Sequence, residues 1–272
     1  MSGFDKDWLA LRERADESAR DKSLLPQIPI PGREEFRVLD LGAGTGSNLR
    51  YLAPRLRTLG ASSQNWILVD DDPSLLEGAS FSAGDLHIKK ENLNLAQHIP
   101  DFQETRPALI TASAFFDLVS EDWLARFATH CAAARVPAGL FALNVDERMN
   151  WDPDDPMDDE IRELFHRHMQ SDKGFGRALG PRGPIVLEHA FAAAGYQVRS
   201  GDSAWQLLPN DIDMQRALLK FYTTAAMEAA PSEASRIDKW SARRADLIVA
   251  GKSHLTVGHR DVLVLWKRRH ET

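Results

Sequence analysis

The stretch Val38-Leu-Asp40-Leu-Gly42-Ala-Gly44-Thr-Gly46-Ser-Asn48 decides the fold of this chain. Its first half completes an apolar run, residues 36–41, which predicts a buried β-strand. The alternating glycines that follow let the backbone turn tightly and come close to a ligand. Residues 47–59 then predict a helix whose free N–H groups and positive dipole end face the turn. A strand, a glycine turn and a helix in this order are typical of a nucleotide site beyond the carboxyl end of a strand.

The glycine spacing bears on which nucleotide could bind. The dinucleotide fingerprint reads G-x-G-x-x-G, and its third glycine would fall where this chain has Ser47. The turn reads G-x-G-x-G instead, with Asp40 at the end of the strand. We therefore disfavour the alternative of a glycine-rich turn in some other Rossmann-like protein.

Apolar segments alternate with helical segments along most of the chain. Besides residues 36–41, strands are expected at 66–69, 86–93, 108–112, 139–145, 197–200 and 261–266. Further helices are expected at 73–79, 121–134, 185–194, 212–229 and 232–250. Strands that alternate with helices at this spacing imply right-handed crossovers and a parallel sheet.

We expect the chain to form a single domain, residues 1–272. Three of its segments do not follow the alternation of strands and helices. Residues 1–32 predict an amphipathic helix followed by a proline-rich linker. Residues 146–185 are polar, rich in Asp, Pro and Gly, and contain one expected helix at 158–168, so we interpret them as a cap insertion. Residues 208–252 hold the last two expected helices and form a C-terminal helical insertion.

The glycine turn and the second strand resemble class I S-adenosylmethionine-dependent methyltransferases. Trp66-Ile-Leu-Val-Asp70 is similar to the family's second-strand segment, whose terminal carboxylate accepts hydrogen bonds from two ribose hydroxyls. The resemblance covers residues 36–145, and the whole chain resembles bacterial, small-molecule members. It implies an α/β, Rossmann-like doubly wound, seven-stranded and mostly parallel sheet with an antiparallel last strand, plus a helical cap.

The resemblance also implies the cofactor S-adenosyl-L-methionine and its contacts. Glu91-Asn-Leu93 is similar to a segment whose acid bonds the adenine amine, although Asn92 stands here in place of Asp. The fourth-strand exit, residues 111–117, fits the family's layout as well. The cofactor-binding residues implied are Asp40, Gly42, Ala43, Gly44, Gly46, Asn48, Asp70, Asp71, Asn92, Leu93 and Ser113.

The sequence lacks the motifs of methyltransferases that act on two classes of methyl acceptor. Methyltransferases that act on adenine or glutamine amides carry Asn- or Asp-Pro-Pro-Tyr/Phe where this chain has Ala112-Ser-Ala-Phe-Phe116. Cytosine-C5 enzymes need a nucleophilic cysteine, whereas Cys131 lies in an alanine-rich helix, where a free cysteine is usually inert. The net charge of −7 weakly favours a small-molecule substrate and gives no reason to expect a nucleic-acid partner.

Methyl transfer from a sulfonium needs mainly position and desolvation from the protein. A general base is required only if the nucleophile arrives protonated, and the candidates for this catalytic role are Asp117, His166 and His168. The glycines of residues 173–177 indicate a loop that closes on a ligand, which could carry an anionic group. Candidate substrate-binding residues are Trp8, Arg12, Trp151, Lys173, Phe175 and Arg177.

Metal and membrane sites find little support in the sequence. His166 and His168 are two residues apart on a helix and so point to different faces, which disfavours a metal pair. We interpret the acidic run 152–160 as an exposed loop and expect no metal. The sequence has no signal peptide and no apolar run of roughly twenty residues, so we expect a cytoplasmic protein without a membrane partner.

Three functions stay open. The first is a small-molecule O-, N- or C-methyltransferase. The second is an RNA or protein methyltransferase, which would require a basic surface at the mouth of the pocket. The third, from a different class, is a non-catalytic S-adenosylmethionine-binding or regulatory protein. The sequence leaves the oligomeric state unknown.

Overall fold

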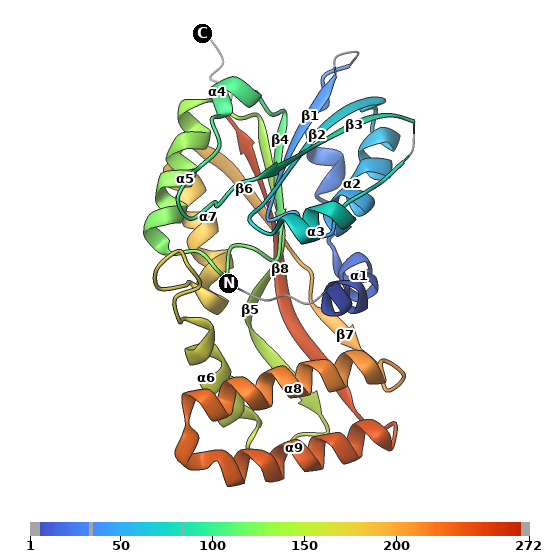
Figure 1. Ribbon diagram of the computed structural model, residues 1–272, viewed down its shortest axis with the longest axis vertical. Coiled ribbons are helices and arrows are strands. Elements are labelled where there is room, and N and C mark those ends of the chain that lie inside the picture. Colours follow the sequence, from blue (N-terminus) through green and yellow to red (C-terminus); the bar gives the residue numbers. More distant parts are fainter. Residues whose placement is uncertain (1–5, 33–34, 83, 268–272) are drawn as a thin grey trace.

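A computed structural model describes residues 6–32, 35–82 and 84–267, and its centre is one mixed sheet of eight strands (Figure 1). The strands are β1 Phe36–Leu41, β2 Ser63–Asp70, β3 Asp85–Asn92, β4 Leu109–Ser113, β5 Ala138–Asp152, β6 Tyr196–Asp202, β7 Trp205–Leu207 and β8 His254–Trp266. Their order is β3-β2-β1-β4-β5-β8-β6, with β7 also paired to β8. The first five strands pair in parallel, and β8 runs antiparallel to β5, β6 and β7.

Helices cover both faces of this sheet. They are α1 Lys6–Ala19, α2 Ser47–Thr58, α3 Pro73–Gly78, α4 Phe102–Thr105, α5 Glu121–Ala133, α6 Asp158–Met169, α7 Gly183–Ala193, α8 Ile212–Ala229 and α9 Ala234–Val249. One core joins the sheet to α5 and α7, and a second joins the other face to α2 (Figure 1). Two layers of helices around a mostly parallel sheet make the fold doubly wound.

The lower part of the molecule in Figure 1 is a helical cap with its own core. The far ends of β5 and β8 extend into it, and α6, α8 and α9 pack against them. Met149 and Trp151 of β5 lie opposite Val257 and Leu255 of β8, and all four side chains are buried. The cap therefore grows out of the sheet.

One buried ion pair holds α9 to the start of α6. The fully buried Arg244 donates hydrogen bonds to the carboxylate of Asp158 and to the carbonyl of Pro153. Trp240 donates its indole N–H to the same carboxylate at 2.8 Å. Because a buried charge is costly without partners, these contacts hold α9 against the start of α6 and the residue that follows β5.

The structure confirms the expected fold class: a Rossmann-like, mostly parallel sheet, an antiparallel last strand and a helical cap. The sheet has eight strands where seven were expected, because Trp205–Leu207 forms a short strand separate from β6. The prediction that a polar insertion begins at residue 146 was wrong, since β5 continues to Asp152. Register shifts between residues 141 and 144 and between 145 and 149 break the alternation that would have indicated a strand. No helix in the described ranges is both long and apolar enough to cross a membrane.

Candidate functional site

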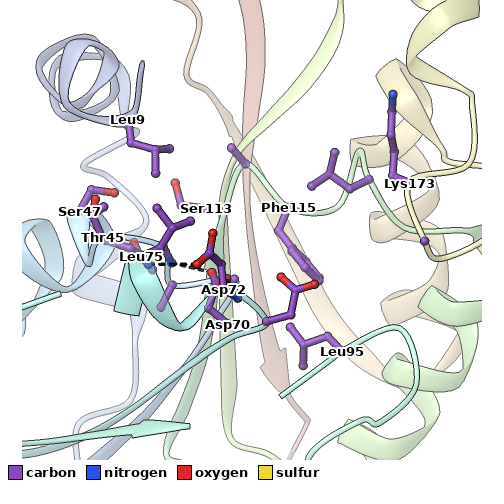
Figure 2. Close-up of a pocket in the computed structure, with 18 of the residues that line it drawn as sticks. Leu9, Thr45, Ser47, Asp70, Asp72, Leu75, Leu95, Ser113, Phe115 and Lys173 are labelled. Carbon is purple, nitrogen blue, oxygen red and sulfur yellow. Dashed lines mark hydrogen bonds between the residues drawn. The ribbon is translucent and has the colours of Figure 1, made fainter. Parts of the chain in front are cut away.

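A cavity of about 290 Å³ lies beyond the carboxyl ends of β1, β2 and β4 (Figure 2). Its wall comes from the turns after these strands, from the segment after β3, from α1 and from the 171–177 loop. In the view of Figure 2, Leu9 of α1 and Lys173 of the loop lie on opposite sides, with Asp70 and Asp72 between them. Open α/β sheets bind their ligands at this edge.

The glycine turn after β1 forms the floor of the cavity. Gly42 and Gly44 line it with φ values of +62° and +52°, a backbone region that disfavours side chains. A Cβ atom on Gly42 would lie only 2.9 Å from Cδ2 of Phe115. Gly46, at the start of α2, has a φ of +81°. It packs against Ala79 and lies outside the cavity. The first two glycines therefore face the ligand space and the third shapes the turn.

The carboxylate of Asp70 at the end of β2 is held by two backbone N–H groups. Gly44 donates to Oδ2 at 2.8 Å and Asp72 donates to Oδ1 at 3.0 Å. Burial raises the pKa of Asp70, and these two hydrogen bonds act in the opposite direction. A carboxylate has about four acceptor positions, so Asp70 retains capacity for a ligand's hydroxyl groups. The neighbouring Asp71 and Asp72 also line the cavity, and Asp72 caps α3.

The segment after β3 gives the cavity an apolar wall. Leu93, Leu95 and Ala96 line it together with Asn94. The indole N–H of Trp123 donates to the carbonyl of Leu95 at 2.7 Å and fixes the segment. Asn92 does not line the cavity, because its amide group turns back to the carbonyl of Asp70 at 3.2 Å.

Asp40 points away from the cavity into a buried polar network. Its Oδ1 accepts from Asn48 at 2.7 Å, and Asn48 accepts in turn from Arg20 at 2.7 Å. Arg20 also donates to the hydroxyl of Ser113 at 2.9 Å. Burial raises the pKa of Asp40 to about 7, against the Asn48 hydrogen bond and the charge of Arg20. Asn48 and Ser113 line the cavity. Asp40 does not line it and instead orients Asn48 through their hydrogen bond.

Helix α1 covers one side of the cavity. Leu9, Arg12 and Asp16 line it, and Arg12 donates two hydrogen bonds to Asp16 at 2.9 and 3.1 Å. Trp205 of β7 donates its indole N–H to the same carboxylate at 3.1 Å. Trp8 lies outside the cavity, edge-on to the ring of Trp205.

The 171–177 loop covers the other side. Lys173, Gly174 and Phe175 line the cavity, and the Phe175 ring packs edge-on against the rings of Phe115 and Trp123. The loop is braced from within, since Asp172 accepts the N–H groups of Gly174 and Gly176 at 2.7 and 3.0 Å. Arg177 donates to Gln170 at 2.9 Å and does not line the cavity.

Besides Trp8 and Arg177, three residues proposed for substrate or catalysis lie away from this cavity, and Asp117 does not line it although the neighbouring Leu118 does. Trp151 is buried in the cap core, because the extension of β5 carries it there. His168 pairs with Glu228 of α8 at 2.9 Å, and His166 on the same helix does not line the cavity. Helix α6 packs on α8, so we no longer place these three side chains in the site.

Sequence reasoning missed about half of the lining residues. The missed residues are Leu9, Asp16, Thr45, Ser47, Asp72, Leu75, Asn94, Leu95, Ala96, Ala114, Phe115, Leu118 and Gly174. Most are close in sequence to a predicted residue. The segments that line the cavity were therefore predicted correctly, although the orientation of each side chain was unknown. Asp16 could have been found from its position four residues after Arg12 on a helix, where opposite charges pair.

The charges on the cavity wall are predominantly negative. Four aspartates line it, at positions 16, 70, 71 and 72, against one arginine and one lysine, Arg12 and Lys173. Such a wall favours a ligand with positive charge and disfavours one with several phosphates. Among the described residues, no group of three or more His, Cys, Asp or Glu side chains is arranged to hold a metal ion.

No protein-family model matches the chain, and no curated protein matches its sequence. Among solved structures, it is similar to the cyclopropane synthase MmaA2 from Mycobacterium tuberculosis, with 10% identity over 97% of this chain and 87% of that chain and a TM-score of 0.46. It is also similar to the magnesium protoporphyrin IX methyltransferase ChlM from Synechocystis PCC 6803, with 15% identity over 75% and 81% of the two chains and a TM-score of 0.44.

A third similar structure is a putative sarcosine dimethylglycine methyltransferase from Galdieria sulphuraria. It shares 17% identity over 93% of this chain and 85% of that chain, with a TM-score of 0.42. These identities and TM-scores are too low to assign an activity to this chain. The function is therefore inferred from the residues of the cavity.

Proposed function

We propose that this chain binds S-adenosyl-L-methionine in the cavity and transfers its methyl group to a small molecule. The observation that carries the proposal is the hydrogen bond from Gly44 to Asp70, which places the glycine turn and the second-strand acid on one wall. When bound, the cofactor supplies a methyl group on a positively charged sulfur atom. The protein's part is to bind, orient and exclude water.

The two ends of the cavity fit the two ends of this cofactor. Asp70 offers acceptor oxygens for ribose hydroxyls, and the apolar wall at residues 93–96 with Phe115 suits a planar adenine ring. At the other end, Asp16 and Arg12 present one negative and one positive group. That pair matches the ammonium and carboxylate of an amino acid.

The charge of the wall separates this cofactor from other nucleotides. S-adenosyl-L-methionine has no phosphate and carries a sulfonium and an ammonium group, whereas NAD and ATP bring negative phosphates. With four aspartates against two cations on the wall, the positively charged ligand is favoured. The same balance supports a small-molecule acceptor, since an RNA substrate would need a basic surface at the mouth.

Isothermal titration of the wild-type protein tests the cofactor proposal. We expect binding of S-adenosyl-L-methionine and of its demethylated product, and none of NAD or ATP at the same concentrations. Binding of NAD or ATP without the methylated cofactor would contradict the proposal.

Label transfer tests the acceptor class. The protein is incubated with methyl-tritiated cofactor and, separately, with the small-molecule, RNA and protein fractions of a cell extract. We expect label in the small-molecule fraction. Label only in RNA or protein would support the macromolecular alternative, and binding without transfer to any fraction would support the non-catalytic one.

A further inference from the structure

The 171–177 loop is ordered by contacts inside it and just beyond its end. Within the loop, the Asp172 carboxylate accepts two backbone N–H groups, at 2.7 and 3.0 Å. Leu179, two residues after the loop, donates its backbone N–H to the carbonyl of Val119 at 2.9 Å, in the connection between β4 and α5. The ring of Phe175 packs edge-on against two aromatic rings of that region. The loop therefore presents its side chains from an ordered backbone.

Lys173 of this loop brings a positive charge to the side of the cavity away from α1. It is half-buried and lines the cavity across from Leu9 (Figure 2). Within residues 6–32, 35–82 and 84–267, its ammonium group forms no ion pair and donates no hydrogen bond. Asp117 attracts it electrostatically without pairing with it. Taking an ammonium group partly out of water is costly without a partner, so a negatively charged ligand beside it would be favoured.

Most of the other charged side chains on the wall are already engaged. Arg12 pairs with Asp16 at 2.9 Å. Asp70 and Asp72 accept backbone N–H groups beyond the end of β2. Of the two cations that line the cavity, Lys173 is therefore the one left for a ligand.

The proposed cofactor leaves the loop side of the wall unassigned. It accounts for the glycine turn, the end of β2, the segment after β3 and the paired charges of α1. The lining residues on the loop side are Leu118, Lys173, Gly174 and Phe175. Two of these side chains are apolar and one is cationic, so this part of the wall suits a molecule with an apolar body and an anionic group.

We propose that Lys173 binds an anionic group of the methyl acceptor and so selects acidic small molecules as substrates. The inference rests on the proposed function. The apolar body of the acceptor lies against Leu118 and Phe175, and its anionic group pairs with the ammonium group of Lys173. Because a lysine acts as a point charge, the site accepts either a carboxylate or a phosphate. Neutral and cationic acceptors would leave Lys173 without a role.

Separating acceptors by charge tests the substrate class. The small-molecule fraction of a cell extract is passed over an anion exchanger at neutral pH. The retained and the unretained molecules are then incubated separately with the wild type and methyl-tritiated S-adenosyl-L-methionine. We expect label in the retained, anionic molecules. Label only in the unretained molecules would overturn the inference while leaving the proposed function intact.

Substitutions test the residue itself. Lys173→Met removes the charge but keeps an unbranched apolar side chain. We expect it to raise the amount of retained molecules needed for half-maximal transfer by about tenfold to a hundredfold, the usual effect of losing a hydrogen bond to a charged group. Lys173→Arg should restore most of this loss. Lys239→Met, at an exposed position of α9 outside the cavity, should behave as the wild type does.

Cofactor affinity and ionic strength separate this role from a merely structural one. Isothermal titration should give all these proteins the same affinity for S-adenosyl-L-methionine, because Lys173 contacts the acceptor. Added salt should raise the half-maximal amount of acceptor for the wild type more than for Lys173→Met, since it screens the ion pair. Equal half-maximal amounts and equal salt dependence in the two proteins would overturn the inference. Failure of the wild type to bind S-adenosyl-L-methionine would overturn the proposed function itself.

Discussion

The backbone N–H of Gly44 donates a 2.8 Å hydrogen bond to Oδ2 of Asp70 and so joins the turn after β1 to the end of β2. The bond orients the carboxylate along the cavity wall and uses one of its acceptor positions. It also holds a glycine with a φ of +52° in its turn. One contact thus couples the shape of the turn to the position of the acid that we assign to the ribose.

Replacing Asp70 by Asn should weaken binding of S-adenosyl-L-methionine by about tenfold to a hundredfold. The change removes the charge from a group assigned to two ribose hydroxyls, and hydrogen bonds to charged groups contribute about 1.5–3 kcal/mol. Isothermal titration measures the effect. Asp85→Asn, at the opposite end of β3 and outside the cavity, is the matched control and should bind as the wild type does. Equal affinities for all three proteins would refute the ribose assignment.

Replacing Gly42 by Ala should reduce both stability and cofactor affinity. A φ of +62° costs an alanine about 1–2 kcal/mol, and its Cβ would also displace the Phe115 ring from 2.9 Å. Gly195→Ala is the control, because its φ of +95° brings backbone strain but nothing lies within 4 Å of the new Cβ. We expect both variants to unfold at lower urea concentrations and only Gly42→Ala to lose affinity. If Gly42→Ala bound S-adenosyl-L-methionine with unaltered affinity, Phe115 would not form part of the wall of the cofactor site.

Replacing Asp158 by Asn should destabilise the cap by about 3–5 kcal/mol, the usual cost of leaving one partner of a buried pair uncompensated. Arg244 is fully buried and would keep its charge. Glu160→Gln on the same helix breaks only a surface pair with Arg236 and should change the urea midpoint little. Equal midpoints for the two variants would contradict the buried-pair account.

His259 should make the protein sensitive to mild acid. Burial lowers the pKa of His259 to about 3, from about 6.5 in an unfolded chain. Between pH 7 and pH 5 the unfolded state therefore gains a proton that the folded state does not, and the free energy of unfolding falls by about 2 kcal/mol from this group. Urea unfolding of the wild type and His259→Gln at both pH values measures the difference. If the free energy of unfolding fell equally in the two proteins between pH 7 and pH 5, His259 would not be the acid-sensitive group.

Much of the cofactor half could be predicted from the sequence. The strand at residues 36–41 and the glycine turn after it are local features, and so is the acid that ends β2 at Asp70. Their short-range patterns need no distant partner to be recognised. Leu93, which the family resemblance implied, also lines the cavity.

Features that depend on distant contacts could not be predicted. The direction of Asp40 is set by Asn48 and, through it, by Arg20, which lies 28 residues before Asn48. Trp151 resembled a loop aromatic because polar residues flank it, yet its burial depends on β8 more than a hundred residues later. The β-bulges in β5 removed the alternation that would have indicated the strand.

A crystal structure of the complex with S-adenosyl-L-homocysteine tests the central claim most directly. We predict that both ribose hydroxyls lie within hydrogen-bond distance of the Asp70 carboxylate. The adenine should lie against residues 93–96 and Phe115, and the amino-acid end should lie near Asp16 and Arg12. A product bound elsewhere, or a ribose out of reach of Asp70, would contradict the account.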